Sequence, residues 1–187
     1  MKQISDYIGY YKNYFPDNFC DDVIKRFENA NWESHTWQTN NQEAFSYNEK
    51  ELSVYKLNDT IDKDISVILW QNIANCLGNY QFEKNLQVYT SNVSKIRLNR
   101  YTPGTMMRKH VDHIYDLFDG KQKGIPVLSI IINLNNDYEG GELVFFDNLK
   151  FSLQKGDVVI FPSNFIYPHS INEVKSGIRY SAVAWGY

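Results

Sequence analysis

Apolar positions in the first 80 or so residues recur at helical intervals. A first amphipathic helix is predicted after Pro16, because apolar residues there are three or four positions apart: Cys20, Val23, Ile24 and Phe27. A second, longer helix is expected from about Asp59 or Thr60, either of which could cap it, to Gly78. Its buried stripe would contain Ile61, Ile65, Ile68, Leu69, Ile73, Cys76 and Leu77.

The segment between these helices, residues 31–57, has no clear periodicity. It is polar and rich in Asn, Gln and Glu. The only element that its sequence predicts is a strand at Leu52–Leu57.

From Val93 onward the pattern changes to short apolar runs separated by turn residues such as TPG, NNDYEGG and KSG. Many short strands in under 100 residues favour a two-sheet jelly roll, also called a double-stranded β-helix, with helices packed on one sheet. We therefore expect a mainly β, α+β fold in one domain, with a support region at 1–92 and a core at 93–187. The eight predicted strands are Ser94–Tyr101, Met106–Asp112, Ile125–Asn135, Gly141–Phe146, Phe151–Leu153, Asp157–Pro162, His169–Val174 and Gly177–Trp185.

Composition narrows the class of protein. Of the 187 residues, 43% are hydrophobic and 16% aromatic, which excludes a disordered chain. The net charge of −3 and the absence of a long Lys/Arg run argue against a nucleic-acid partner. The cysteines, Cys20 and Cys76, lie in apolar stretches and are predicted to be core residues. No signal-peptide pattern and no apolar run of about 18 residues occurs, so we expect a cytoplasmic protein without a membrane partner.

Candidate metal ligands occur in the segment KHVDH. Residues i and i+2 of a strand point to the same side, so His110 and Asp112 would present an imidazole and a carboxylate together. His169 opens a predicted strand 57 residues after Asp112 and could complete a two-histidine, one-carboxylate site for iron(II). An HxD triplet alone often arises by chance, and most single histidines bind no metal.

Arg179 follows His169 by ten residues, and strand alternation puts it on one face with Ser181, Val183 and Trp185. A guanidinium that points into an apolar interior needs an anion, and it matches a carboxylate with two parallel hydrogen bonds. A dicarboxylate co-substrate would supply that group. The alternative is an internal ion pair with Glu142 or Asp157.

The order of these residues resembles the prolyl-4-hydroxylase-like branch of the iron(II)- and 2-oxoglutarate-dependent dioxygenases, and PKHD-type hydroxylases in particular. The resemblance spans roughly Val93 to Trp185. The segments that carry it are RYTPGTMMRKHVD, IINLNNDYEGGELVFF, LQKGDVVIFPSNFIYPH and the strand that contains Arg179.

Carried over residue by residue, the resemblance implies that His110, Asp112 and His169 bind Fe(II), and that Arg179 binds the distal carboxylate of 2-oxoglutarate. It also implies that ascorbate is a candidate reductant. Three more co-substrate contacts are implied: Tyr101, Ser181 and Asn133. For Tyr101 the alternative is the role of an ordinary core tyrosine. Gly140 and Gly141 are interpreted as turn glycines.

The family likeness favours a prolyl residue in a peptide or protein as the substrate, and leaves lysyl, asparaginyl and free amino-acid targets open. Collagen-type members commonly have lysine where this chain has Arg179, so the likeness to that subgroup is weaker. Nucleic-acid demethylases of the superfamily carry a second arginine six residues further on, where this chain has Trp185. Halogenases lack the carboxylate ligand, so Asp112 argues against that activity.

Three questions stay open at this level. Residues 113–124 could form a substrate lid or a solvated loop without function. The chain could be a cupin-like metal-binding jelly roll without oxygenase activity, which would leave Arg179 unexplained. It could also be a structural or carbohydrate-binding jelly roll in which the HVD triplet is accidental. Oligomeric state is not predicted.

Overall fold

The computed structural model describes residues 2–38, 44–46, 50–87, 90, 92–112 and 125–187. Within them, a short 3-10 helix (Ile4–Tyr7) and two α-helices accompany antiparallel sheets. The large sheet has the order β1 (Gly9–Tyr11), β12 (Val158–Pro162), β8 (Leu128–Asn133), β15 (Arg179–Gly186), β6 (Arg97–Tyr101), β5 (Ser53–Lys56), β2 (Glu33–Ser34). The second sheet has the order β11 (Leu149–Phe151), β10 (Leu143–Phe145), β13 (His169–Ile171), β7 (Met107–His110). Two small sheets pair β14 (Val174–Gly177) with β9 (Tyr138–Gly140), and β3 (Trp37–Gln38) with β4 (Ala44–Phe45).

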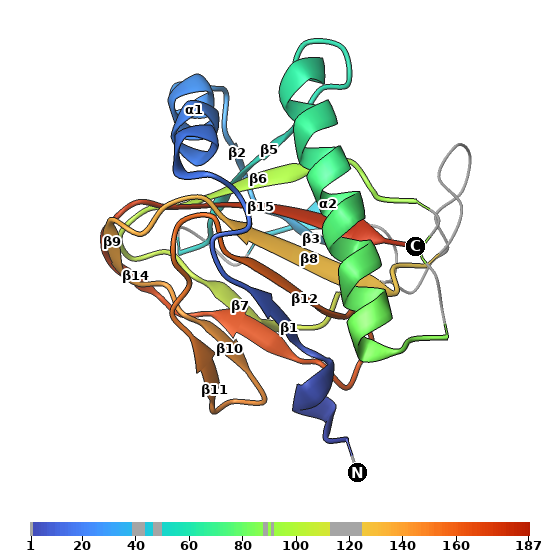
Figure 1. Ribbon diagram of the computed structural model, residues 1–187. Helices are drawn as coiled ribbons and strands as arrows, with labels where there is room; N and C mark the ends of the chain where they lie inside the picture. Colours follow the sequence, from blue (N-terminus) through green and yellow to red (C-terminus); the bar gives the residue numbers. More distant parts are fainter. Residues whose placement is uncertain (1, 39–43, 47–49, 88–89, 91, 113–124) are drawn as a thin grey trace.

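The large sheet is covered on both faces, because alternate residues of its strands belong to two different cores. On β8, Ile130 and Ile132 pack with residues of the two α-helices, whereas Ile131 packs with Leu143 and Phe145 of the second sheet. Figure 1 shows both helices on one side of the large sheet. The result is a layer of helices on a two-sheet sandwich, which confirms the mainly β fold expected from the sequence.

The first helix, α1 (Asp17–Phe27), is where the sequence predicts it. Cys20, Val23 and Phe27 of its apolar stripe are buried, and Ile24 is partly buried. Asp17 lies in the first turn and two cations, Lys25 and Arg26, lie in the last turn, which matches the direction of the helix dipole.

The second helix, α2 (Lys63–Lys84), begins later and ends later than predicted. Asp62 is the residue before the first turn, and its carboxylate accepts hydrogen bonds from the backbone of Asn58 and the hydroxyl of Tyr55. Gly78 lies inside the helix, which ends at Asn85 in the left-handed conformation, φ 53°. Ile61 and Ile68, predicted to be buried, are 73% and 41% exposed; the other stripe residues are buried.

The segment that the sequence left unassigned forms edge strands. β2 and β5 extend the large sheet, with Glu33 opposite Val54, and β3 pairs with β4 beside them. The predicted strand at Leu52–Leu57 is present as β5. β1, β9 and β14 were not predicted as separate strands; each has only three or four residues, too few for a periodic pattern.

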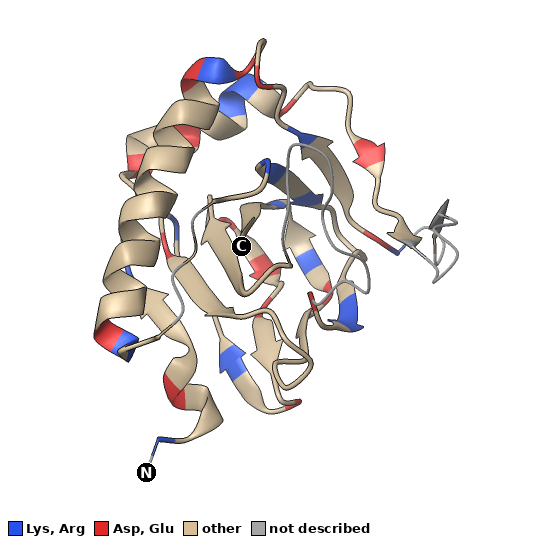
Figure 2. Ribbon diagram, turned by 90° about the vertical axis from the view of Figure 1, so that its right-hand side faces the viewer, with Lys and Arg blue, Asp and Glu red and all other residues tan. Residues whose placement is uncertain are grey.

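Cys20 and Cys76 are both free and buried, as predicted. Residues with positive and negative charges are interspersed along the ribbon (Figure 2). In the described part of the chain, no helix is long and apolar enough to cross a membrane.

Candidate active site

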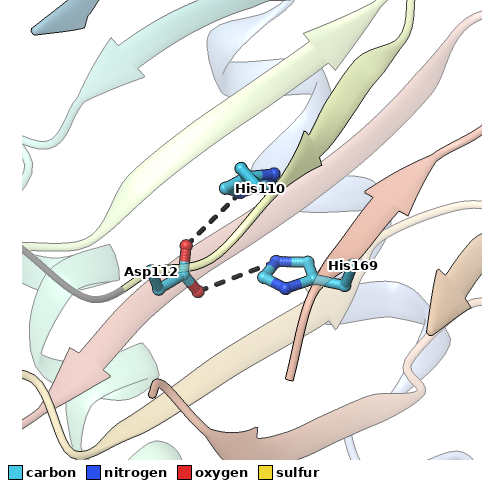
Figure 3. Close-up of side chains that lie close together, drawn as sticks. All are labelled: His110, Asp112 and His169. Atoms are coloured by element: carbon cyan, nitrogen blue, oxygen red, sulfur yellow. Dashed lines mark ion pairs between the residues drawn. The ribbon is translucent and has the colours of Figure 1, made fainter. Parts of the chain in front are cut away.

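His110, Asp112 and His169 converge from two neighbouring strands. β7 ends at His110, β13 begins at His169, and the register pairs these two residues. Asp112 lies just past β7, and its carboxylate is between the two imidazoles (Figure 3). The distance from Nε2 of His110 to Oδ1 of Asp112 is 3.4 Å, and that from Nε2 of His169 to Oδ2 is 3.8 Å. One potential ligand atom from each residue lies within 4.8 Å of the others.

The backbone fixes which ring nitrogen of each histidine faces this cluster. Nδ1 of His110 bonds to the carbonyl of Arg108 at 2.7 Å, and Nδ1 of His169 bonds to the carbonyl of Tyr167 at 3.1 Å. A carbonyl only accepts, so each Nδ1 carries the proton in the neutral ring. Both Nε2 atoms therefore direct a lone pair toward the cluster, which is the arrangement that a metal ligand needs.

The protonation states also suit a cation. Burial alone would raise the pKa of Asp112, but the two histidines and a hydrogen bond from Ser129 outweigh it, so the net effect is a lower pKa. Burial lowers the pKa of His169 to about 4, only partly opposed by Asp112. At neutral pH the cluster therefore contains a carboxylate and a neutral imidazole, and both can donate electron pairs.

A pair of buried serines holds Asp112. Ser129 Oγ donates to Oδ2 of Asp112 at 2.6 Å, and Oγ of Ser163 lies 2.8 Å from Ser129 Oγ. Since the proton of Ser129 goes to the carboxylate, Ser163 is the donor of the second bond. The chain Ser163–Ser129–Asp112 connects the cluster to strand β8 of the large sheet. The sequence did not identify these two residues.

Arg179 is fully buried at the start of β15. Its guanidinium lies 5.0 Å from the ring centroid of Tyr101 and donates from Nη1 to Ser181 Oγ at 3.3 Å. Among the described residues, Nε and Nη2 have no hydrogen-bond partner. The alternative ion pairs with Glu142 and Asp157 are not formed among the described residues: Glu142 accepts from Asn172, and Asp157 accepts from Tyr10 and two backbone amides.

Gly140 and Gly141 have positive φ, 78° and 66°, as expected of turn glycines. Gly141 also makes room for the arginine, since a Cβ there would lie 2.9 Å from Cδ of Arg179. Gly141 was predicted to be a turn glycine, and its contact with Arg179 was not predicted.

Asn133 is buried, and its contacts are with the protein itself. Its Nδ2 donates to the carbonyl of Asn135 at 2.6 Å and approaches those of Leu153 and Gln154 at 3.3 Å. Its Oδ1 accepts from the Tyr138 hydroxyl at 3.3 Å. These bonds join β8 to the turn before β12.

A single pocket includes the three clustered side chains and Arg179. Alternation along β6 and β15 directs their inward residues into it, as predicted for Arg179, Ser181, Val183 and Trp185. Residues 113–124, the predicted lid, lie outside the described residues. The pocket is lined by Arg97, Asn99, Tyr101, Met107, His110, Asp112, Ile130, Ile131, His169, Ile171, Arg179, Ser181, Val183 and Trp185.

The unassigned segment 31–57 also contributes to the site. The Trp37 ring meets His110 edge-on, with centroids 5.4 Å apart. Its Nε1 donates to both carboxylate oxygens of Glu51, at 2.7 and 2.8 Å, and His35 Nδ1 lies 3.1 Å from Glu51 Oε2. The sequence shows Trp37 and His35 within an otherwise polar segment. Neither belongs to a repeating pattern of apolar positions, so their roles could not be predicted.

The sequence is similar to that of known proteins. The family model of the 2OG-Fe(II) oxygenase superfamily matches residues 96–187. A PKHD-type hydroxylase of Prochlorococcus marinus (strain MIT 9215) is 30% identical over 169 residues, which cover 74% of this chain and 73% of that protein. The chain belongs to the 2OG-Fe(II) oxygenase superfamily. The resemblance inferred from the sequence is confirmed.

This 2OG-Fe(II) oxygenase is also similar to Prolyl 4-hydroxylase 1 of Arabidopsis thaliana, at 31% identity over 120 residues that cover 53% of the chain and 42% of the plant protein. Among solved structures, its fold is similar to a Trichoplax adhaerens prolyl hydroxylase in complex with a hypoxia inducible factor peptide fragment, with a TM-score of 0.71 at 13% identity, covering 98% and 84% of the two chains. The protein is thus a prolyl 4-hydroxylase-like dioxygenase that uses Fe(II) and 2-oxoglutarate.

Proposed function

We propose that this oxygenase hydroxylates a prolyl residue of a peptide or protein. In this proposal His110, Asp112 and His169 bind Fe(II), and Arg179 anchors 2-oxoglutarate. The observation that carries the proposal is the presence, in one pocket, of a three-residue ligand cluster and a buried guanidinium with two unpartnered donor atoms.

The ligand cluster fits Fe(II). Two neutral imidazoles and one carboxylate form the donor set of non-haem iron oxygenases, which leaves positions on the metal open for other ligands. Cys20 and Cys76, the residues that a structural zinc site would use, lie in the helix-side core. When bound, Fe(II) together with 2-oxoglutarate and dioxygen supplies the oxidant that inserts oxygen into a C–H bond.

The other end of the pocket fits a carboxylate. A fully buried cation with unpartnered Nε and Nη2 is costly unless an anion reaches it, and those two atoms suit the two oxygens of a carboxylate. Ser181 orients the guanidinium through its hydrogen bond with Nη1. The Tyr101 ring covers one face of it, and its hydroxyl would join Arg179 in holding the co-substrate.

The contacts of Asn133 are structural, so its proposed contact with 2-oxoglutarate rests on the resemblance alone. The two facing antiparallel sheets support a jelly-roll arrangement, in which β7 and β13 of one sheet carry the iron ligands and β15 of the other carries Arg179.

Residues around the site hold the ligand side chains in position and exclude water from it. The hydrogen bonds of both Nδ1 atoms keep Nε2 directed at the metal, and Ser129 keeps the Asp112 carboxylate in place. Apolar side chains from both sheets, Ile131, Ile171 and Val183 among them, exclude water from the reacting atoms.

Support for a prolyl substrate comes from the relatives, one named as a prolyl 4-hydroxylase and one solved with a peptide fragment. Lysyl, asparaginyl and free amino-acid targets are the competing outcomes. A metal-binding protein without oxygenase activity is disfavoured, because it gives the unpartnered donors of Arg179 no role.

The experiment is an aerobic assay with Fe(II), 2-oxoglutarate and a library of proline-containing peptides, each paired with the peptide in which alanine replaces proline. We expect succinate and a mass increase of one oxygen only with the prolyl member of a pair. Hydroxylation that is independent of proline would overturn the prolyl assignment. Loss of turnover in Asp112→Ala, with unchanged thermal unfolding, is the control for the metal site.

A further inference from the structure

A second arginine faces the same pocket as Arg179. Strand β6 pairs with β15 so that Tyr101 is opposite Arg179 and Arg97 is opposite Val183. Alternation along β6 gives Arg97 and Tyr101 the same inward direction, and both line the pocket. Val183 is four positions beyond Arg179 on β15, so the two arginines enter the pocket about 13 Å apart along the strand direction.

Arg97 lies at the end of the pocket where the iron ligands are. Ser129, which holds Asp112, is paired with Trp185 of β15, two residues beyond Val183. Burial lowers the pKa of Arg97, and the nearby charge of Asp112 partly opposes that effect. Arg179 and Arg97 therefore mark opposite ends of the pocket, and the ligand cluster is near Arg97.

The described contacts hold Arg97 in place but give its guanidinium no ion-pair partner. Nε donates to Oδ1 of Asn99 at 3.0 Å, and the guanidinium lies over the Trp185 ring, 5.3 Å from its centroid. The ion pairs of the described residues do not include Arg97. Burial lowers the pKa of Arg97, although an arginine stays protonated at physiological pH.

Asp112 cannot serve as the missing partner. Its Oδ2 accepts from Ser129, and both oxygens face the two imidazoles. Asn99 accepts from Nε, and Trp185 covers one face of the guanidinium. In the part of the chain that the structure describes, the Nη donors are left for an anion in the pocket. A planar carboxylate matches that pair of donors.

We propose that Arg97 binds a carboxylate of the substrate, within a few bonds of the carbon that is hydroxylated. This deepens the proposed function and rests on it: for a prolyl residue of a peptide or protein, the group is the α-carboxylate of a carboxyl-terminal prolyl residue. Internal prolyl residues, whose carbonyl is an amide, lack the charge that Arg97 recognises. Asn99 and Trp185 are positioning residues that keep the guanidinium directed into the pocket.

The test compares each acid with its amide in the Fe(II)-loaded enzyme with 2-oxoglutarate. The pairs are L-proline and L-prolinamide, glycyl-L-proline and its amide, and the non-prolyl pair L-leucine and L-leucinamide. Succinate and hydroxylated product are measured, together with the concentration of each compound that perturbs the visible absorption of the anaerobic Fe(II)–2-oxoglutarate enzyme. We expect the wild type to prefer a prolyl acid over its amide by about 10- to 100-fold in kcat/KM, the range of a charged hydrogen bond.

Arg97→Gln should bring this acid-to-amide ratio close to one, and Arg97→Lys should restore part of it. The matched control is Arg100→Gln, on the same strand, whose guanidinium lies over Trp32 on the helix side. It should leave the ratio unchanged. The acid-to-amide ratio separates recognition from a structural role, because partial unfolding lowers the rates with both compounds equally.

Equal use of acid and amide by the wild type, or no turnover with any acid, would overturn the inference. A preference that persists in Arg97→Gln would overturn it as well. A higher 2-oxoglutarate requirement in Arg97→Gln, with an unchanged ratio, would assign the residue to the co-substrate instead. Turnover of prolyl amides alone would support prolyl hydroxylation but contradict the recognition of a carboxylate by Arg97. Turnover of leucine but not of prolyl acids would support the recognition of a carboxylate but contradict the prolyl assignment.

Discussion

Ser129 Oγ lies 2.6 Å from Oδ2 of Asp112, so a buried hydroxyl of the large sheet holds the carboxylate that sits between His110 and His169. The carboxylate follows β7, in the second sheet, and the serine belongs to β8. This bond connects the two sheets at the candidate iron site.

Replacing Ser129 with alanine should weaken iron binding. Loss of the bond frees Asp112 to rotate, and removal of such supporting partners typically costs about 10- to 100-fold in metal affinity. The measurement is an anaerobic Fe(II) titration of Ser129→Ala against the wild type, with Ser176→Ala on the exposed strand β14 as the control. Equal iron affinity in all three proteins would remove the supporting role of Ser129.

Alanine at Gly141 should raise the 2-oxoglutarate requirement. The added Cβ would lie 2.9 Å from Cδ of Arg179, so the arginine must move. Gly104→Ala is the matched control, because Gly104 also has a positive φ, 87°, but a Cβ there has nothing within 4 Å. Both variants should lose about 1 kcal/mol of stability from backbone strain.

The concentration of 2-oxoglutarate at half-maximal succinate formation separates the two variants. We expect it to rise only in Gly141→Ala. A rise of the same size in Gly104→Ala would mean that strain, and not the contact with Arg179, is responsible.

Trp37 should stabilise the site through Glu51. Trp37→Phe keeps an aromatic ring for His110 but removes both hydrogen bonds to the buried carboxylate, which should cost about 1–3 kcal/mol in the free energy of unfolding. Trp37→Ala should in addition weaken iron binding, because the His110 ring loses its neighbour. Urea unfolding and Fe(II) titration test the two effects separately.

The control is Trp32→Phe, which removes one indole hydrogen bond, to the Phe27 carbonyl, on the helix side of the large sheet. It should reduce stability without affecting iron. If Trp37→Ala binds iron as the wild type does, the contact with His110 is incidental.

The two cysteines should not react in the folded protein. Burial, as the largest cause, raises the pKa of Cys20 to about 11 and that of Cys76 to about 12, from a usual value of 9.0. The reactive thiolate is therefore scarce at pH 8, and both sulfurs are enclosed. Thiol titration with a disulfide reagent should detect no fast-reacting group in buffer and two in 6 M guanidinium chloride; a fast-reacting thiol in buffer would contradict the burial.

Much of the site could be predicted from the sequence, because its residues lie in short motifs and these motifs follow one another in a recognisable order along the chain. The alternation from Arg179 to Trp185 follows from strand geometry. His110 and Asp112 were predicted to share one strand, but β7 ends at His110 and Asp112 follows it. The position of His169 at the start of a strand was also predicted correctly. These elements meet in one pocket because of the order of the strands in the sheets. The periodicity of the sequence does not determine that order, so the expectation that they meet came from the family resemblance.

The missed parts depend on long-range packing. Ser129 appears as an ordinary residue of an apolar strand, and its role arises only when β7 ends beside β8. Trp37 and Glu51 lie in two-residue strands or bridges, where no pattern can form. The end of α2 was misplaced because Gly78 is a common stop signal, whereas the apolar contacts of Tyr80 continue the helix past it.

The most direct test of the account is an anaerobic titration with Fe(II) and then with 2-oxoglutarate, followed by the weak visible charge-transfer band of the bound pair. The wild type should develop the band at one equivalent of each, Asp112→Ala should not develop it, and Arg179→Ala should require much more 2-oxoglutarate. A band that forms normally in Asp112→Ala, or a 2-oxoglutarate requirement that is unchanged in Arg179→Ala, would contradict the assignment of these residues.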